Sequence, residues 1–462
     1  MTLDREGYDV LITDFYDAVH YIFSTYTRSK PHRKDSFDQE TRTPQFTKKL
    51  LNQLGSPDQH GTTIKVTGSK GKGSTARLLA GILQAHQIKT GLFTSPHLID
   101  FTERIRVQGR AIDEADFMRL LTRVKPFADE IDRCMQPHEY FGPVGLTAVV
   151  AALYFLEQQT QMSVVELGRG ARFDDVNQWH GEYGVITPIH FEHAKQLGPT
   201  LADIAWNKAG IFTPGMKKAF LSRQVPEVER VLTFHAKEQG VEFLQLGRDM
   251  TVESVQVTTL GTLLTIKTPY AVYENVELSL YGRHQADNLA VAVAAAEAIM
   301  NKPCDKETLQ AFAKRCTFYG RMQLVIGNEK RPDVFVDGAI HREAAQSIAQ
   351  VVRLIRDERQ IQSVITVIGV PQDKDYVGVI EEASQCSSRL ILTKAKNPSL
   401  HFTEDAVRVA KSLGDARYID TLPDALQDAC DMAGPNGLVI VLGTQSIVAE
   451  ALAYLDVDTR HL

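Results

Sequence analysis

Cysteine is scarce in this sequence and forms no recognisable motif. The 462 residues include only 5 cysteines, with no Cys-x-x-Cys pair and no Cys/His spacing typical of zinc sites. This scarcity excludes a disulfide-stapled scaffold and favours a reducing compartment. The charged N-terminus also lacks the apolar stretch of a signal peptide. We therefore expect a cytoplasmic protein.

A surplus of positive charge and a long apolar run are also absent. Lys and Arg number 51 against 57 Asp and Glu, a formal net charge of -6, whereas proteins that neutralise nucleic-acid phosphates carry the opposite imbalance. The most apolar run, residues 144–156, is shorter than the ~20 residues needed to cross a bilayer, so we expect a buried helix there. From these absences we expect that the protein binds neither nucleic acid nor membrane.

What is present predicts an α/β protein of two or three domains. From about residue 62, short β-branched apolar runs alternate with helical patterns, which is typical of a parallel sheet covered by helices on both faces. A helix is expected over 74–86, and another from 288. The predicted strands are 63–67, 91–94, 163–167, 183–187 and 219–222, followed by 334–337, 364–368, 390–393 and 438–442.

Residues 250–281 differ, because strand-like runs there are separated only by short turns. This pattern predicts a small antiparallel insert within an N-terminal domain over residues 1–316. A linker over 317–320 would join that domain to a smaller, Rossmann-like α/β domain over 321–462.

A glycine-rich loop, TGSKGKGST over residues 67–75, stands between a predicted strand and the helix that Ser74 opens. Gly68, Gly71 and Gly73 would let backbone N–H groups close around phosphate oxygens, and Lys72 could reach the β and γ phosphates. The loop therefore predicts ATP binding, although a glycine-rich turn with a surface lysine is the alternative. Gly73 stands where other phosphate loops carry a magnesium-binding hydroxyl, so another residue must supply that ligand.

Several segments, in matching order, resemble the folylpolyglutamate synthase/dihydrofolate synthase family, a branch of the Mur-type ATP-dependent amide ligases. They are TGSKGKGST (67–75), TSPHL (94–98), FTERIRV (101–107), VELGRGARFDDVN (165–177), IAWNKAGI (204–211), GRHQ (282–285), GRMQ (320–323), DGA (337–339) and DKD (373–375). The resemblance extends from about residue 14 to 450. It implies a phosphate-loop ATPase domain followed by a C-terminal ligase domain, and activation of a carboxylate as an acyl phosphate that an amine attacks.

The resemblance also implies a metal site. Ser95, Glu166 and His193 would hold Mg²⁺ between the phosphates, so that Ser95 replaces the hydroxyl missing at Gly73. Lys208 matches a lysine that relatives carry as a carbamate, which would ligate a second divalent cation and requires a buried amine with a lowered pKa. Taken singly, each residue has a structural alternative. Ser95 would cap a helix, and Glu166 would pair with Arg172 at the end of a strand. His193 would be an ordinary loop histidine, and Lys208 would complement the dipole at the C-terminus of a helix.

Further roles are implied on the two sides of a predicted cleft. Lys72, Lys208 and His193 would be catalytic, whereas Asn288, Arg321 and Asp337 would join Gly68, Gly71, Lys72, Gly73 and Ser74 in binding ATP. Closure of the domains over the nucleotide would follow from this placement. The alternative for Arg321 is a surface ion pair.

Four segments depart from the family pattern. Ile340 and His341 follow Asp-Gly-Ala where relatives read His-Asn-Pro, and Glu192 stands for an aspartate before His193. Asp175 replaces a small residue beside Asp174, in the stretch that resembles the pterin-contacting loop. Asn207 replaces a glutamate. We therefore treat Asp174, Asp175, Ile340 and His341 as candidate substrate residues of a divergent member.

The leading hypothesis is a monomeric ATP- and Mg²⁺-dependent ligase that joins an amino acid, by default L-glutamate, to a folate or dihydropteroate carboxylate. A second hypothesis keeps the chemistry and changes the carboxylate to a peptide or specialised metabolite, because of Asp175 and Ile340. A third is a nucleotide-binding regulator that has lost catalysis.

Overall fold

The structure is a computed structural model that describes residues 11–33 and 36–462. Its N-terminal domain is built on an eight-stranded sheet of order β4-β3-β2-β5-β1-β6-β7-β8. The strands are β1 (Thr62–Thr67), β2 (Thr90–Phe93), β3 (Ile105–Val107), β4 (Arg110–Ala111), β5 (Met162–Glu166), β6 (Tyr183–Ile186), β7 (Lys218–Leu221) and β8 (Phe243–Gln245). The neighbours pair in parallel except β2 with β3 and β3 with β4. All five strands predicted for this domain are confirmed.

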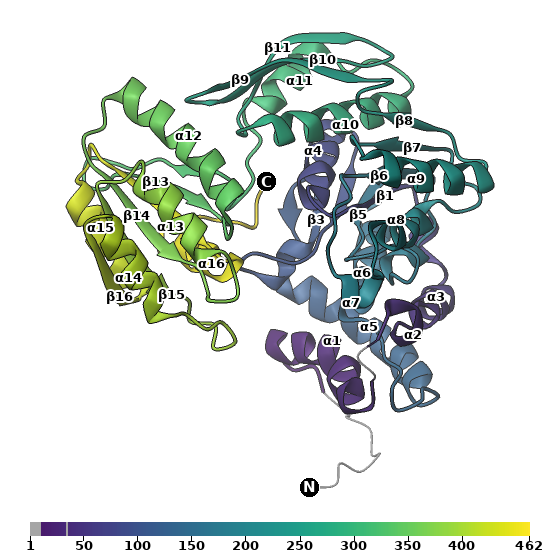
Figure 1. The fold of residues 1–462 in the computed structure, drawn as a ribbon. Coiled ribbons are helices and arrows are strands. Elements are labelled where there is room, and N and C mark those ends of the chain that lie inside the picture. The colour runs from purple at the N-terminus through teal and green to yellow at the C-terminus, as the bar shows by residue number, and fades with distance from the viewer. Residues whose placement is uncertain (1–10, 34–35) are drawn as a thin grey trace, which may run out of the picture.

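Helices cover both faces of this sheet (Figure 1). They are α1 (Phe15–Ser29), α2 (Asp38–Thr41), α3 (Pro44–Gln53), α4 (Lys72–Ala85), α5 (Glu114–Asp132), α6 (Pro143–Glu157), α7 (Ala194–Leu197), α8 (Leu201–Lys208), α9 (Pro226–Glu238), α10 (Arg283–Met300) and α11 (Lys306–Ala313). Short 3₁₀ helices are η1 (Lys30–His32), η2 (Pro57–Gln59), η3 (Phe101–Arg104), η4 (Val176–Gln178) and η5 (Ala209–Ile211). The side chains of β1 alternate between two cores, because Ile64 and Val66 pack toward α4 and α10 whereas Lys65 faces the opposite side.

The apolar run predicted as a buried helix is α6, and most of its 15 residues are buried in the core shared with α1, α3 and α5. In the part of the chain that the structure describes, no helix is long and apolar enough to span a membrane. Helix α10 starts at Arg283, five residues before the predicted start at Asn288. The residues of its first turn show no apolar periodicity, so the sequence pattern did not indicate a helix there. That turn nevertheless belongs to the helix that packs against α4.

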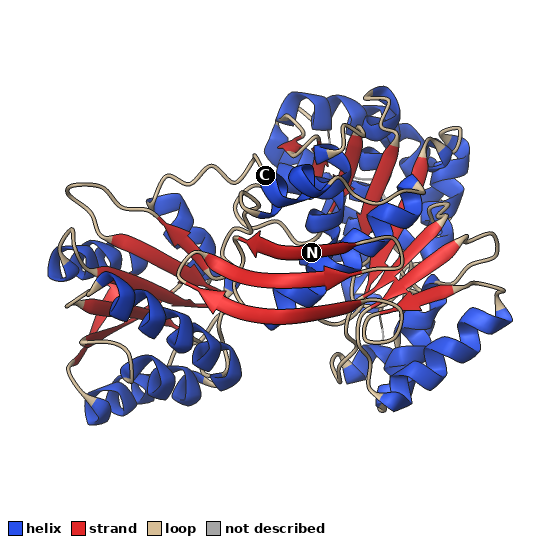
Figure 2. Ribbon diagram, turned by 90° about the horizontal axis from the view of Figure 1, so that it is seen from above, coloured by secondary structure: helices blue, strands red, loops and turns tan. Residues whose placement is uncertain are grey.

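The predicted antiparallel insert is a three-stranded sheet of order β11-β10-β9. Its strands are β9 (Thr251–Thr258), β10 (Gly261–Lys267) and β11 (Val272–Leu278). Figure 2 shows these strands passing from the N-terminal domain toward the C-terminal one. Val257 packs against the C-terminal core, and the Thr259 hydroxyl donates to Glu358 of α12 at 3.1 Å. The insert therefore contacts both domains.

The C-terminal domain has a six-stranded sheet of order β12-β13-β17-β14-β15-β16, parallel except at β12. The strands are β12 (Gln323–Val325), β13 (Asp333–Asp337), β14 (Val364–Gly369), β15 (Arg389–Lys394), β16 (Ala416–Thr421) and β17 (Leu438–Gly443). The helices are α12 (Arg342–Arg359), α13 (Tyr376–Ser384), α14 (Glu404–Leu413), α15 (Leu422–Ala433) and α16 (Gln445–Tyr454). The four predicted strands are confirmed, and the additional β12 and β16 are half-exposed edge strands without a continuous apolar run.

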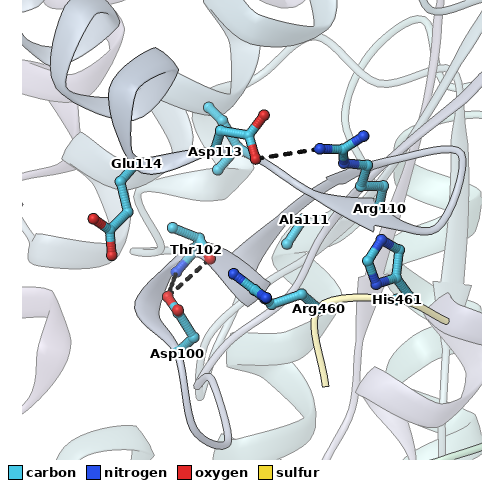
Figure 3. Close-up of a pocket in the computed structure, with 9 residues that line it drawn as sticks. Asp100, Thr102, Arg110, Ala111, Asp113, Glu114, Arg460 and His461 are labelled. Atoms are coloured by element: carbon cyan, nitrogen blue, oxygen red, sulfur yellow. Dashed lines mark hydrogen bonds and ion pairs between the residues drawn. The ribbon is translucent and has the colours of Figure 1, made fainter. Parts of the chain in front are cut away.

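The last residues of the chain return to the N-terminal domain. The Arg106 side chain is fully buried and donates to the carbonyl oxygens of Thr459 and Arg460, both at 2.7 Å. The Ala111 N–H also donates to Arg460 O, at 2.9 Å. Figure 3 shows the shallow pocket beside this contact, where Arg110 pairs with Asp113 at 3.5 Å. Residues 459–462 thus hold the end of the C-terminal domain against β3 and β4.

We predict that Arg106→Met lowers the free energy of unfolding by about 1.5–3 kcal/mol, because two hydrogen bonds from a charged donor are lost inside the protein. Urea-induced unfolding measures this. The control is Arg110→Met, whose side chain is 66% exposed and whose ion pair with Asp113 is a surface pair, for which we expect less than about 1 kcal/mol. Equal losses in the two variants would contradict the structural role of Arg106.

Candidate active site

The glycine-rich loop connects β1 to the N-terminus of α4. Gly68 has φ 138° and Gly71 has φ 85°, conformations that favour glycine. A Cβ atom would lie 2.0 Å from Thr187 Oγ1 at Gly68 and 2.9 Å from Asn288 Oδ1 at Gly71. The glycines are therefore required both for the backbone turn and for close packing. Lys72 folds back over the loop, where its ammonium group donates to Gly68 O at 3.0 Å.

Glu166 ends β5 beside this loop. Its side chain is buried, and Oε2 accepts a hydrogen bond from the Ser95 backbone N–H at 3.1 Å. A Cβ atom at Gly73 would lie 3.3 Å from the same oxygen, so glycine at this position leaves the carboxylate room at the start of α4. Burial raises the pKa of Glu166, and the charges of Lys72, Arg77 and Arg104 oppose that rise. A carboxylate therefore lies inside a cluster of cations.

His193 follows β6 and has a left-handed backbone, with φ 49°. Loss of solvation lowers the pKa of its ring, although the charge of Glu192 opposes that shift. The lowered pKa favours the neutral imidazole, which is the form that can bind a metal. In the described part of the chain, no hydrogen bond joins His193 to Ser95 or Glu166. Nor do residues 11–33 and 36–462 gather three or more His, Cys, Asp or Glu side chains into a metal-binding group.

Lys208, at the end of α8, is fully buried. Its ammonium group donates to Gly68 O at 2.8 Å, to Arg169 O at 2.7 Å and to Glu192 Oε1 at 3.2 Å. These acceptors belong to three different loops, so Lys208, although it is the last residue of α8, makes these hydrogen bonds outside its own helix. Burial lowers the pKa of Lys208 to about 8, with a further contribution from Lys72.

Asp174 and Asp175 are both buried in the loop after β5. Asp174 accepts from the N–H groups of Gly168 at 3.1 Å and Val176 at 3.0 Å, and burial raises its pKa to about 6. Asp175 instead accepts from the Thr47 hydroxyl at 2.8 Å and pairs with Arg42 at 3.5 Å. Its side chain fills the space beside two glycines of α6 and its cap, Gly142 and Gly145. The added carboxylate therefore occupies volume that a small residue would leave open.

The remaining candidates lie on both sides of the domain junction. Asn288 of α10 faces Gly71, as described above, whereas Arg321 and Asp337 belong to the C-terminal domain. Asp337 accepts a hydrogen bond from the Met322 N–H at 2.7 Å. Burial raises the pKa of Asp337 to about 6, although the charge of Arg321 opposes that rise. No ion pair to Arg321 is found in the described part of the chain, so the surface ion pair proposed as its alternative is absent there.

Ile340 and His341 follow Asp337 at the start of α12. His341 is the N-cap residue of that helix, with Nδ1 accepting from the Ala344 N–H at 3.4 Å, and Ile340 packs against the C-terminal core. Within the described residues, no hydrogen bond or ion pair connects either residue to Asp174 or Asp175. The structure thus gives each residue a local contact, and their role in binding substrate stays a prediction.

Sequence models of two domains match this chain. The Mur ligase middle domain matches residues 66–296, and the Mur ligase glutamate ligase domain matches residues 320–445. The dihydrofolate synthase/folylpolyglutamate synthase of Mycobacterium tuberculosis is 30% identical over 437 residues, which cover 87% of this chain and 88% of that protein. The Bacillus subtilis protein of the same name is 28% identical and covers 87% and 92%.

This chain belongs to the folylpolyglutamate synthase/dihydrofolate synthase family. Solved structures of the family have the same fold. The M. tuberculosis folylpolyglutamate synthase, solved with ADP and AMPPCP, is 26% identical, with a TM-score of 0.79 over 94% of this chain and 99% of that one. The Thermotoga maritima folylpolyglutamate synthase has a TM-score of 0.81 at 22% identity and covers 96% of each chain.

Three arginines of the site had no role assigned from the sequence. Arg77 and Arg104 place charge near Glu166, and burial lowers the pKa of both. Arg104 is part of the FTERIRV segment, so the family motif was a signal for it. Arg42, which pairs with Asp38 and Asp175, lies before the glycine-rich loop and had no signal in the sequence.

We predict that Gly71→Ala weakens the binding of a fluorescent ATP analogue by about tenfold or more, because the new methyl group displaces Asn288 beside the phosphate loop. The matched control is Gly55→Ala. Gly55 has the same φ of 85° but nothing within 4 Å of the added Cβ, so both variants carry similar backbone strain. Equal affinities in the two variants would show that the contact with Asn288 does not matter.

Proposed function

We propose that this protein is an ATP-dependent ligase that joins L-glutamate to a carboxylate of a folate or dihydropteroate. The observation that carries the proposal is the meeting of the phosphate loop, Glu166 and the buried Lys208 at the carboxyl ends of β1 and β5. Ligands of parallel α/β sheets bind at this edge. Membership of the family supports the same reaction.

The reaction has two steps. A carboxylate oxygen of the acceptor attacks the γ-phosphorus of ATP, ADP leaves, and an acyl phosphate forms. The amine of glutamate then attacks the acyl carbon, inorganic phosphate leaves, and a proton is lost from the nitrogen as the amide forms. The backbone N–H groups at the start of α4 and the ammonium group of Lys72 would stabilise negative charge on the transferred phosphoryl group. Arg321 would add charge from the other domain.

The donor set fits a magnesium ion. Mg²⁺ prefers oxygen ligands, and Glu166 offers a carboxylate directly beside Ser95 and the phosphate loop. The lowered pKa of His193 leaves a neutral imidazole available as an additional ligand. We propose that Ser95, Glu166 and His193 hold Mg²⁺, which when bound neutralises charge on the phosphates. Arg77 and Arg104 would balance the charge of Glu166 when the ion is absent.

Lys208 meets the requirements for carbamate formation. Only a neutral amine reacts with CO₂, and a pKa of about 8 gives an appreciable neutral fraction near pH 7–8. The ammonium group first loses a proton to give the neutral amine, whose nitrogen then bonds to the carbon of CO₂ and releases a second proton, so that a cation is converted into an anion. We propose that this carbamate would ligate a second divalent cation near the phosphate loop. Glu192 lies within reach of the same position.

The nucleotide would bind between the two domains. Asn288 lies against the phosphate loop from the N-terminal domain, and we propose that Asp337 bonds the ribose or adenine side from the C-terminal domain. We propose that the boundary between the domains lies at residues 317–320, between α11 and β12. All five cysteines are free, which supports a reducing, cytoplasmic setting.

A second candidate function is ligation to a carboxylate other than a folate. The observation that favours it is Asp175, whose buried carboxylate, paired with Arg42 and Thr47, fills space beside α6. An acceptor bound here would have to avoid that volume or exchange hydrogen bonds with the pair. The assay that follows distinguishes the two candidates.

With L-glutamate, Mg²⁺-ATP and either dihydropteroate or tetrahydrofolate, we predict phosphate release that requires both co-substrates and yields a glutamylated product by mass spectrometry. Glu166→Gln should lower kcat by about a hundredfold or more, because the carboxylate charge beside the phosphates is lost. Glu297→Gln is the control, since Glu297 is also a buried carboxyl but bonds to Tyr273 away from the loop. Release with another carboxylate and with no folate would favour the second candidate.

We predict that protein equilibrated with ¹³C-bicarbonate shows a carbamate carbon signal by NMR, and that Lys208→Arg abolishes it. The matched control is Lys65→Met, because Lys65 is a second buried lysine whose pKa burial lowers to about 8. The signal should persist in that control. A signal that survives in Lys208→Arg would show that the carbamate, if formed, lies elsewhere.

A further inference from the structure

A second cavity lies in the N-terminal domain, apart from the phosphate loop. Its volume is about 540 Å³, and it is enclosed by α3, the C-terminal end of α9, and the loops around η4 and η5. This volume lies within the range of sites that bind metabolites. Three cations, Lys48, Lys65 and Arg172, line it, together with the aromatic rings of Trp179 and Phe212.

Lys65 is a buried cation that the proposed reaction does not use. Its side chain is 1% exposed, and its ammonium group donates to Asn177 O at 2.9 Å and Asn177 Oδ1 at 3.2 Å. In the described part of the chain it forms no ion pair with a carboxylate, and one of its three N–H groups has no acceptor. Gly181 makes room for it, because a Cβ there would lie 2.5 Å from Lys65 Cε.

Arg172 is a second cation in the cavity wall without a carboxylate partner among the described residues. It stacks on the Trp206 ring at 4.2 Å and donates to Trp206 O at 3.3 Å. Its Nε atom and the indole Nε1 of Trp179 are both buried without a hydrogen-bond partner. Buried polar groups are normally satisfied, so two such donors in one cavity wall need an explanation.

The charges around the cavity do not balance. The one acidic side chain that lines it is Glu238, which bonds to His235 Nδ1 at 3.0 Å, and Lys48 pairs with Asp58 at 3.6 Å. Burial lowers the pKa of Lys65 and of Arg172, and the charges of nearby carboxylates oppose that shift, Asp58 and Asp174 for Lys65 and Glu238 for Arg172. Among the described residues, however, neither cation forms a direct ion pair with a carboxylate. Burying a cation without a partner is costly, and a bound anion would remove that cost.

We propose that this cavity binds a small metabolite anion with at least two carboxylate or phosphate groups, held by Lys65 and Arg172. Asn177 and Gly210 form part of the cavity wall and are bonded to each other, Asn177 Nδ2 to Gly210 O, at 2.9 Å. They lie three residues after Asp174 and two after Lys208, respectively. An anion in the cavity thus braces the two segments that carry active-site residues without touching the phosphate loop.

Calorimetric titration of the full chain tests this proposal, with the phosphate loop kept occupied by saturating Mg²⁺ and AMPPCP. The probes are citrate for the carboxylate class and pyrophosphate for the phosphate class. We expect saturable binding of one of them at one site per chain. Lys65→Met should weaken it by about tenfold to a hundredfold, because a hydrogen bond to a charged group is lost.

Two further variants keep the result decisive. Arg172→Met removes the second cation that we propose holds the anion, so it tests the site even if Lys65→Met does not fold. Lys237→Met is the matched control, because Lys237 is an exposed residue of α9 that does not line the cavity. Citrate binding alone assigns carboxylates to the site, and pyrophosphate binding alone assigns phosphates. Absence of binding of both probes, or equal affinity in Arg172→Met and Lys237→Met, would overturn the proposal.

Discussion

The buried ammonium group of Lys208 holds the active site together. It bonds to the carbonyl of Gly68 in the phosphate loop, to that of Arg169 after β5, and to Glu192 after β6. A buried cation without these acceptors would cost several kcal/mol, so Lys208 in its ammonium form favours mutual contact of the three loops. Gly68 is part of the phosphate loop, Glu166 lies three residues before Arg169, and His193 directly follows Glu192. The arrangement of these parts of the site therefore depends on the contacts of Lys208.

Positive charge is concentrated at the active site, although the chain as a whole is negative. The net charge is -6, yet Lys72, Arg77 and Arg104 all influence the buried carboxylate of Glu166. Such a cluster suits a site that receives phosphates together with a metal ion, since charge of both signs is needed in a small volume.

Several contacts besides the linker connect the two domains. The β9–β11 sheet reaches the C-terminal domain through Val257 and Thr259. The end of the chain returns to Arg106, and the Thr459 hydroxyl donates to Glu103 Oε1 at 2.7 Å. Glu103 also accepts from the N–H groups of residues 98–100, three to five residues after Ser95. The position of the C-terminal domain is therefore coupled to the segment that carries a proposed metal ligand.

Local patterns in the sequence determined the α/β class, the buried strands, the antiparallel insert and the phosphate loop, because each depends on periodicity or on glycine at a turn. The motif order also determined the family. Edge strands such as β16 escaped detection, since their half-exposed residues carry no apolar pattern. Only the tertiary structure decided that Lys208 bonds to other loops, that Asp175 pairs with Arg42, and that Lys65 lines a cavity. Burial and contacts across more than a hundred residues set those outcomes, and neither leaves a trace in local spacing.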